Sequence, residues 1–331
     1  MKALHTTRRE AIGMIGCATL AAGWLSRAGS AAAARPAISF GYQATLWGAP
    51  AIVAEDERLF QGLGADVRMK RFSSGKAIRD AMIAEGVDMG SLGGTPFIVG
   101  VAKGEVAAVA AMAYAGRTLM VVAHKDAGIT SIADLKGKKV GSQRGSSTDH
   151  IFQNTILPAF GLSKGDVQIV NVSFQDHVSA LASRSVDAFA GVDPYPTITE
   201  HMGIGVVLTD YSKYDLTPVL IAVNRPVLEK SPGAVVEFLK GWLRSVRIFK
   251  EGPERATTVV WNNFKAQGYD VPKAVIKTSL SHMAITPEFI PELKPYLIEQ
   301  SKLLVEQRQI DRVPDWDREL VRGPLAEAMK A

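Results

Sequence analysis

Two short stretches rich in glycine and hydroxyl residues are the parts of this sequence best suited to bind a ligand. They are 91–96 (SLGGTP) and 142–148 (SQRGSST). Each follows an apolar, strand-like run and opens a helix-like run. A helix N-terminus presents unpaired backbone N–H groups and the positive end of the helix dipole, and it therefore favours an anion. Together, the two turns predict a cleft that holds an anion from both sides.

The residues expected to hold the anion lie in these two turns. Gly94 and Thr95 belong to the first turn, and Ser146, Ser147 and Thr148 belong to the second. Backbone N–H groups and hydroxyl groups together give a partly positive environment without a full counter-charge. Such a site binds an anionic head group and still releases it.

Four further residues are candidates for the walls of the cleft. Gln43 ends the first strand and is either a ligand contact or a solvated loop amide. Trp47 either lines the cleft or packs at a helix entry. Asp193 either pairs with an amine on the ligand or caps the helix that Pro194 begins, and capping is slightly favoured. Tyr195 would line the same wall.

Motifs for catalysis, cofactors and metals are missing from the sequence. It has no G-x-S-x-G, G-x-x-x-x-G-K-[ST], H-E-x-x-H or G-x-G-x-x-G pattern. The histidines after residue 34 are scattered and do not have metal-ligand spacing. Cys17 is the only cysteine. We therefore expect no catalytic residue, no cofactor and no metal site.

The first 34 residues are typical of a twin-arginine signal peptide. Arg8 and Arg9 precede a mildly apolar stretch over 11–25, and small residues follow over 30–34. We expect cleavage near Ala34 and export to the periplasm. The alternative of a lipoprotein anchored through Cys17 is disfavoured, because almost no apolar region separates that cysteine from Arg9.

Charge and hydropathy exclude two function classes for the rest of the chain. The whole chain has a net charge of +5, and residues 1–34 contribute four basic side chains and one acid, which leaves about +2. The densest basic run, 136–139, is typical of a solvated turn, so binding to nucleic acid is not expected. No uncharged apolar run after Ala34 reaches the roughly 18 residues of a membrane span.

Short apolar strands alternate with helices in two successive blocks, which predicts an α/β fold. Long β-branched runs at 118–125 and 217–223 are candidates to cross between the blocks, and helices over 148–160 and 287–307 are among those expected. The expected architecture has two mixed sheets flanked by helices, with lobe 1 formed by 35–122 and 221–331 and lobe 2 by 123–220. A two-crossing hinge near Ala123 and Leu220 would join them.

Four segments of the sequence together have the order and spacing of a known family. They are 41–43 (GYQ), 87–90 (VDMG), 132–141 (IADLKGKKVG) and 185–188 (SVDA), the last ahead of Asp193-Pro194. They resemble the solute-binding proteins of ABC importers for nitrate, taurine and aliphatic sulfonates, and the resemblance extends from about Ile38 to Val223. It implies a type II periplasmic-binding-protein fold, closure of two lobes around a small solute, and delivery to a permease and its ATPase at the inner membrane.

We therefore expect a monomeric periplasmic solute-binding protein without enzymatic activity. Its ligand would be an aliphatic sulfonate or a taurine-like anion, with nitrate or another small anion second. One alternative is a fold-related enzyme. Desulfinases of this type use a cysteine nucleophile, which the chain lacks after Cys17, and thiamine-pyrimidine synthases of related fold are cytosolic. The other alternative is a periplasmic sensor that presents its ligand to a receptor.

Overall fold

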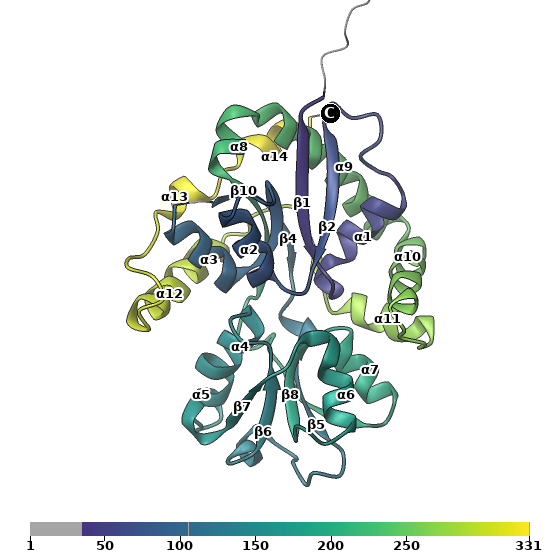
Figure 1. Cartoon of the computed structure of the whole chain (residues 1–331), viewed down its shortest axis with the longest axis vertical. Helices are drawn as coiled ribbons and strands as arrows, with labels where there is room; N and C mark the ends of the chain where they lie inside the picture. Colours follow the sequence, from purple (N-terminus) through teal and green to yellow (C-terminus); the bar gives the residue numbers. More distant parts are fainter. Residues whose placement is uncertain (1–34, 105, 331) are drawn as a thin grey trace, which may run out of the picture. The chain divides into compact units, whose positions relative to one another are not determined.

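Two mixed β-sheets flanked by helices organise the protein (Figure 1). The structure is a computed structural model that describes residues 35–104 and 106–330. The strand orders are β11-β4-β10-β3-β1-β2 and β7-β6-β8-β5-β9. The prediction of an α/β fold with two mixed sheets is confirmed. The predicted signal peptide, with Cys17, lies outside the described residues.

In the larger sheet, one antiparallel strand is inserted among parallel ones. β1 pairs in parallel with β2 and β3, whereas β10 runs antiparallel between β3 and β4. The short strand β11 pairs with the free edge of β4. The strands are β1 (Ala37–Gln43), β2 (Asp66–Phe72), β3 (Met89–Gly93), β4 (Val106–Tyr114), β10 (Pro218–Asn224) and β11 (Ala284–Ile285).

The smaller sheet repeats this arrangement. β6 pairs in parallel with β7 and β8, and β5 runs antiparallel between β8 and β9. In both sheets the inserted strand is the one that directly follows a connection from the other sheet. The strands are β5 (Leu119–His124), β6 (Lys139–Ser142), β7 (Gln168–Asn171), β8 (Ala188–Val192) and β9 (Gly205–Asp210).

The two connections between the sheets lie outside the predicted hinge positions. Ala123 pairs with Ala188 on one side and Val206 on the other, within the smaller sheet. Leu220 is paired on both sides within the larger sheet. The boundaries predicted at 122/123 and 220/221 therefore fall inside hydrogen-bonded strands. The chain crosses at 115–118 and at 211–217, so lobe 1 comprises 35–114 and 218–330, and lobe 2 comprises 119–210.

The helices that follow the strands cover both sheets (Figure 1). Lobe 1 contains α1 (Ala49–Asp56), α2 (Gly75–Ile83) and α3 (Gly94–Ala102). Lobe 2 contains α4 (Ser147–Ile151), α5 (Leu157–Ala159), α6 (His177–Ala182) and α7 (Tyr195–His201). A π-helical turn, Phe152–Ile156, joins α4 to α5, so the helix predicted over 148–160 is continuous but irregular. Pro158 has no N–H to donate to the preceding turn, which disfavours a regular α-helix there.

After β10 the chain is mainly helical and packs on lobe 1. The helix predicted over 287–307 is wrong at its start, because α12 begins only at Leu293. The preceding residues lie along β4 instead, where β11 pairs and the Ala111 N–H donates to the Pro287 carbonyl at 2.9 Å. The helices are α8 (Arg225–Lys230), α9 (Pro232–Glu251), α10 (Pro253–Ala266), α11 (Lys273–Ser281), α12 (Leu293–Glu306), α13 (Trp316–Glu319) and α14 (Gly323–Ala328).

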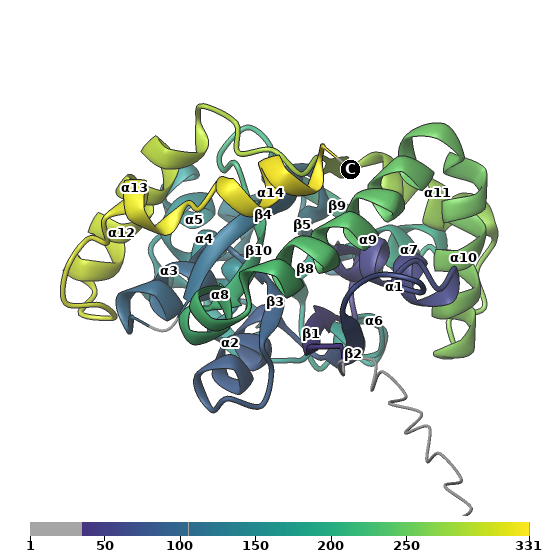
Figure 2. The ribbon, with the colours of Figure 1, turned by 90° about the horizontal axis from the view of Figure 1, so that it is seen from above.

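Helix α9 anchors this C-terminal part to the larger sheet. It lies beside α1 and α14 (Figure 2), and Phe238 and Trp242 on its inner face are fully buried against Phe40 of β1. The ring centroids of Phe40 and Phe238 are 4.7 Å apart. Each such buried side chain contributes about 1.5–3 kcal/mol of transfer free energy. This packing fixes β1, whose carboxyl end carries Gln43.

None of the helices in 35–104 and 106–330 combines the length and the apolar character needed to cross a membrane.

Candidate ligand-binding cleft

Three helices begin where the carboxyl ends of strands from both lobes meet. α2 follows β2, α3 follows β3, and α4 follows β6. Open α/β sheets bind ligands at such strand ends. A small cavity lies at this point, and both lobes contribute to it. It is lined by Gln43, Trp47, Gly75, Gly93, Pro96, Ser146, Ser147, Thr148, Phe174 and Val192.

The two predicted glycine-hydroxyl turns touch each other across this cleft. The Thr95 N–H donates a hydrogen bond to Ser147 Oγ at 3.3 Å. Gly93 lies so close that a Cβ placed on it would be 2.5 Å from Ser147 Oγ and 2.9 Å from the Trp47 ring. The remaining cavity of about 10 Å³ is no larger than a water site. The cleft is therefore closed on itself, and an anion would have to take the place of the Ser147 hydroxyl.

The caps of these helices come from serine side chains. Ser146 Oγ accepts a hydrogen bond from the Asp149 N–H at 3.1 Å, and it thus caps α4. Ser74 Oγ accepts from the Ala77 N–H at 3.3 Å and caps α2. Ser147 and Thr148 occupy the first turn of α4, where backbone N–H groups have no partner within the helix. The hydroxyl of Ser146 is thus committed to the helix, whereas that of Ser147 faces the other lobe.

Gln43 and Trp47 form a buried wall of the cavity. Gln43 Nε2 donates to the Ser91 carbonyl at 3.4 Å, which ties the end of β1 to β3. Trp47 Nε1 donates to Thr118 Oγ1 at 2.8 Å, at the first connection between the lobes. Both side chains are less than 5% exposed. The structure thus brings these two predicted residues to the cleft.

Asp193 and Tyr195 do not line the cavity. Asp193 is fully buried, where its carboxylate accepts a hydrogen bond from Thr197 Oγ1 at 2.7 Å and contacts His282 Nδ1 at 2.7 Å. The Tyr195 hydroxyl donates to the Ala44 carbonyl at 3.1 Å. Burial raises the pKa of Tyr195. Both residues connect lobe 2 to lobe 1 beside the cavity, and their predicted contact with the ligand stays a prediction.

The first two residues of α3 lie at the margin of the cavity. The Cα of Gly94 faces Tyr296, since a Cβ there would be 3.3 Å from the tyrosine hydroxyl. Thr95 is 7% exposed, and its side chain lines a neighbouring space rather than the cavity. Of these two residues, Thr95 reaches the cleft through its backbone N–H.

The helix predicted from Gly75 is confirmed as α2, but its start at Ser74 and Gly75 was not among the predicted binding residues. The pattern was present: residues 72–75 (FSSG) follow a strand, contain hydroxyl residues and glycine, and open a helix. A Cβ on Gly75 would lie 3.4 Å from the Gly93 nitrogen and 3.6 Å from Gln43 Nε2, so α2 begins beside the other two helices. Phe174 and Val192 were also missed, because nothing in their local sequence distinguishes a cleft wall from a core position.

The lining of the cavity carries no charged side chain. Behind the wall residue Phe174 lies His177, whose ring is stacked on Phe189 at 4.7 Å. Burial lowers the pKa of His177 to about 3, so this ring is neutral at physiological pH. Among the described residues, no group of three or more His, Cys, Asp or Glu side chains is placed to hold a metal ion. The electrostatic field in the cavity thus comes from helix ends and hydroxyl groups.

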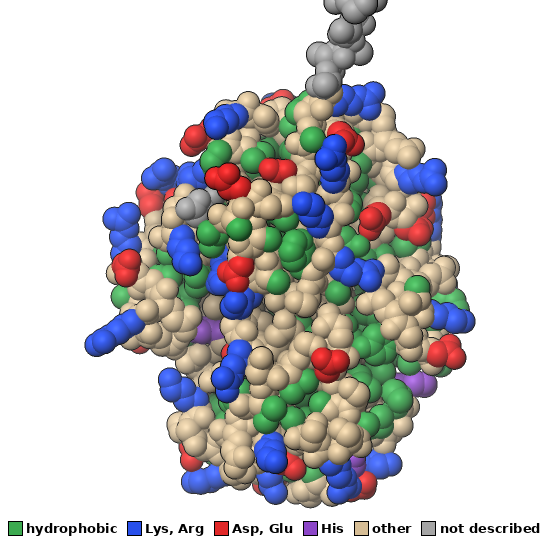
Figure 3. Space-filling view, viewed as in Figure 1, with side chains coloured by type: hydrophobic (Ala, Val, Ile, Leu, Met, Phe, Trp, Pro, Cys, Tyr) green, Lys and Arg blue, Asp and Glu red, His purple; other side chains and the backbone are tan. Residues whose placement is uncertain are grey.

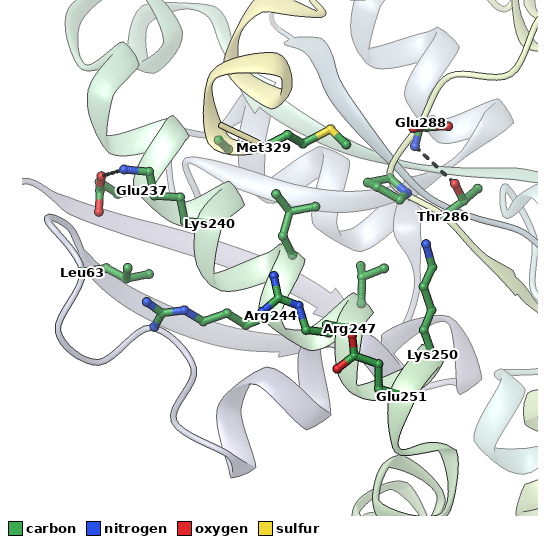
Figure 4. A pocket seen from close by; sticks show the side chains of 14 residues that line it. Leu63, Glu237, Lys240, Arg244, Arg247, Lys250, Glu251, Thr286, Glu288 and Met329 are labelled. Atoms are coloured by element: carbon green, nitrogen blue, oxygen red, sulfur yellow. Dashed lines mark hydrogen bonds and ion pairs between the residues drawn. The ribbon is translucent and has the colours of Figure 1, made fainter. Parts of the chain in front are cut away.

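A larger pocket of about 770 Å³ lies on the outer side of α9, away from the cleft (Figure 4). Two of its four basic side chains have partners: Lys240 pairs with Glu237 at 2.7 Å, and Arg244 donates to the Leu59 carbonyl at 2.9 Å. No helix begins at this pocket, and lobe 2 contributes nothing to it. The small interlobe cavity is therefore the better candidate for the ligand site, despite its size.

Most of the chain matches one known protein family. Residues 31–261, more than half of the chain, match the NMT1-like family. The chain belongs to the NMT1-like family. A binding protein of Brucella abortus is 31% identical over 206 residues, which cover 60% of this chain and 62% of that relative, less than two thirds of its length. The taurine-binding periplasmic protein of Escherichia coli is 26% identical over 279 residues, 80% of this chain and 85% of the relative.

Solved structures confirm the predicted type II periplasmic-binding-protein fold of this NMT1-like chain. The alkanesulfonate-binding protein SsuA from Xanthomonas axonopodis pv. citri, bound to MOPS, has a TM-score of 0.74 at 22% identity, over 89% of this chain and 99% of the other. The desulfurization enzyme DszB has a TM-score of 0.65 at 14% identity, over 89% and 99% of the two chains. At these identities the likeness concerns the fold alone.

Proposed function

We propose that this chain is the exported, monomeric solute-binding component of an ABC importer. It captures a small organic anion by closing its two lobes and presents the closed form to a permease and its ATPase at the inner membrane. The observation that carries the proposal is the meeting of three helix N-termini, α2, α3 and α4, from two lobes around one uncharged cavity. Relatives named for taurine and sulfonates support the choice of ligand.

The chemistry of the cavity suits an anion with one dispersed negative charge. Each helix N-terminus carries roughly half a positive charge, spread over several N–H groups. No lysine or arginine in the lining competes with these groups. A sulfonate has three oxygens, so it can accept hydrogen bonds from more than one helix start at once. Nitrate is a smaller anion of the same kind and is the second choice.

The side chains that line the cavity suit an anion that also has a short apolar part. Trp47, Pro96, Phe174 and Val192 line the same cavity as the hydroxyl groups. Such a mixture of apolar walls and a few directed polar groups is typical of small-molecule sites. Because Thr95 and Ser147 contact each other across the cleft, the lobes have to part before a solute enters.

An enzymatic role has less support. The cavity lining contains no cysteine, histidine, lysine or carboxylate that would act as a nucleophile or a general base. The similarity to a desulfurization enzyme concerns the fold. A sensor that presents its ligand to a receptor would use the same cleft, and it differs from an importer only in its partner.

Thermal unfolding with candidate ligands tests the proposal. The panel contains ethanesulfonate, taurine, MOPS, nitrate, acetate and a neutral control such as ethanol. A ligand at one hundred times its dissociation constant adds about 2.7 kcal/mol to the free energy of unfolding. We expect at least one sulfonate to give this shift and ethanol to give none. A flat response to every anion would refute the proposal, and release of sulfite from a sulfinate would favour the enzyme.

A further inference from the structure

A second space of about 420 Å³ lies beside the cavity, on the other side of the contact between α3 and α4. Thr95 lines this space and Ser147 lines the cavity, so the bond between the Thr95 N–H and Ser147 Oγ separates the two. We call this second space, which Thr95 lines, the side chamber. Its walls come from α2 and α3 of lobe 1, from the segment after α12 near Gln307, and from α4 and the residues after it in lobe 2.

The side chamber is positively charged, in contrast to the cavity. Lys76 and Arg79 of α2 line it from lobe 1, and Lys164 lines it from lobe 2. Lys76 and Arg79 both contact Asp80, at 2.9 and 2.6 Å. No ion pair joins Lys164 to a carboxylate in 35–104 or 106–330 within 4.0 Å. Figure 3 shows Lys and Arg side chains on both sides of the junction between α3 and α4.

The only carboxylate in the lining is engaged within lobe 2. Asp149 accepts hydrogen bonds from the Gly145 N–H at 3.1 Å and from Gln153 Nε2 at 2.7 Å. With Asp80 paired to Lys76 and Arg79, three cationic side chains stand against two carboxylates, and Lys164 supplies the excess positive charge. An acidic group that entered the chamber would find more positive than negative charge.

A buried histidine in the chamber wall has one ring nitrogen without a well-formed hydrogen bond. His150 is 6% exposed, and its Nδ1 lies 3.4 Å from the Asn154 amide nitrogen, a donor. Nδ1 is then the acceptor, and Nε2 carries the proton. Nε2 has no hydrogen-bond partner among the described residues. Burial lowers the pKa of His150 and keeps the ring neutral, although the charge of Asp149 and a long hydrogen bond with the side chain of Gln300 oppose this shift. A buried donor without an acceptor is costly, and a ligand oxygen would remove that cost.

We propose that the side chamber binds the far end of the captured solute and that this end carries a second acidic group. This inference rests on the proposed function, since it places the first anionic group at the Thr95 N–H in exchange for Ser147. The solute then passes the opened α3–α4 contact, and its second acidic group lies near Lys164 and His150. The preferred ligand class is a short dianion, with two sulfonates or a sulfonate and a carboxylate on one chain.

Calorimetric titration with two matched probes tests this inference on the full chain. The probes are propane-1,3-disulfonate and propane-1-sulfonate, at one fixed ionic strength. We expect the disulfonate to bind at least tenfold more tightly. Lys164→Gln and His150→Leu should each reduce this ratio at least threefold and leave the affinity for propane-1-sulfonate within twofold. Lys230→Gln, the same change at an exposed position of α8 outside the chamber, should leave the ratio unchanged.

The possible outcomes separate the two proposals. Equal binding of both probes, or a ratio that Lys164→Gln and His150→Leu leave unchanged, would overturn the role of the side chamber and leave the anion cleft intact. Binding of neither probe, with a flat thermal response to the whole anion panel, would refute the proposed function itself. Because Lys164 is an exposed side chain, its substitution does not threaten folding even if that of His150 does.

Discussion

Substituting Gly93 by alanine would place a methyl group at the closest approach of the two lobes. The new Cβ would lie 2.5 Å from Ser147 Oγ and 2.9 Å from the Trp47 ring, whereas ordinary contacts begin at 3.4 Å. Gly93 has φ −69° and ψ 166°, an extended conformation that alanine adopts without strain. The effect of Gly93→Ala is therefore purely steric.

The free-energy cost of this clash depends on which of the two neighbouring side chains can move. Trp47 is 4% exposed and is held by its hydrogen bond to Thr118, so its ring is fixed in place. Ser147 belongs to the other lobe and can move away if the cleft opens by about 1 Å. Overpacking of this kind costs about 1–3 kcal/mol. Because Gly93 also lines the cavity, the methyl group takes space from a bound anion, and a cost of this size in the liganded closed state lowers the apparent affinity by about 5- to 150-fold.

Calorimetry of Gly93→Ala with the best sulfonate measures this loss directly, and unfolding in urea measures its effect on stability. We expect weaker binding with a free energy of unfolding within about 1 kcal/mol of the original, because opening relieves the clash. Gly233→Ala is the control, since a Cβ there meets nothing within 4 Å. An unchanged affinity in Gly93→Ala would show that the anion does not bind beside Gly93, and our assignment of the cleft would be wrong.

Three further predictions concern groups around the cleft. Burial raises the pKa of Asp215 to about 6, so the folded state holds this proton more tightly than the unfolded state. Its contribution to stability is complete below the unfolded pKa and is lost as the pH rises through 6, which amounts to about 1.4 kcal/mol between pH 5 and pH 7.5. Urea unfolding should detect this loss, and Asp215→Asn should abolish it. His282→Ala leaves the buried Asp193 carboxylate without its ring partner. It should lower the free energy of unfolding by about 2 kcal/mol, and a loss below 0.5 kcal/mol in the same assay, taken as a rough threshold, would contradict the role of this pair. Trp47→Phe should remove most of the ligand-induced change in tryptophan emission, whereas Trp261→Phe, in α10, should retain it.

The sequence was sufficient for the parts of the site that depend on local pattern. A strand followed by glycine and hydroxyl residues marked the starts of α3 and α4 as binding turns, and the same pattern at 72–75 would have added the start of α2 to them. The sequence could not reveal that Thr95 and Ser147 bond to each other, because that contact depends on how far the lobes close. Asp193 was equally ambiguous, since both a capping carboxylate and a ligand contact fit a position ahead of Pro194.

The errors in the predicted fold concern features that depend on pairing between strands far apart in the sequence. The two crossing strands were identified from their β-branched runs. The sheet to which each strand belongs, however, depends on pairing partners far along the chain. β5 belongs wholly to lobe 2 and β10 wholly to lobe 1. The start of α12 was misplaced for a similar reason, because residues 284–287 are held by β4. Local propensity does not report such partners.

The inserted strand β10 affects the order in which the two lobes fold during synthesis. Residues 119–210 contain every strand of the smaller sheet, so lobe 2 has its complete set of partners as soon as residue 210 has emerged. Lobe 1 does not: β3 and β4 are neighbours only through β10, and their facing edges stay unpaired until residue 224 is made. Unpaired edges invite aggregation. We therefore expect the lobe that begins later in the chain to finish folding first, and the first lobe to depend on the cell's chaperones for longer.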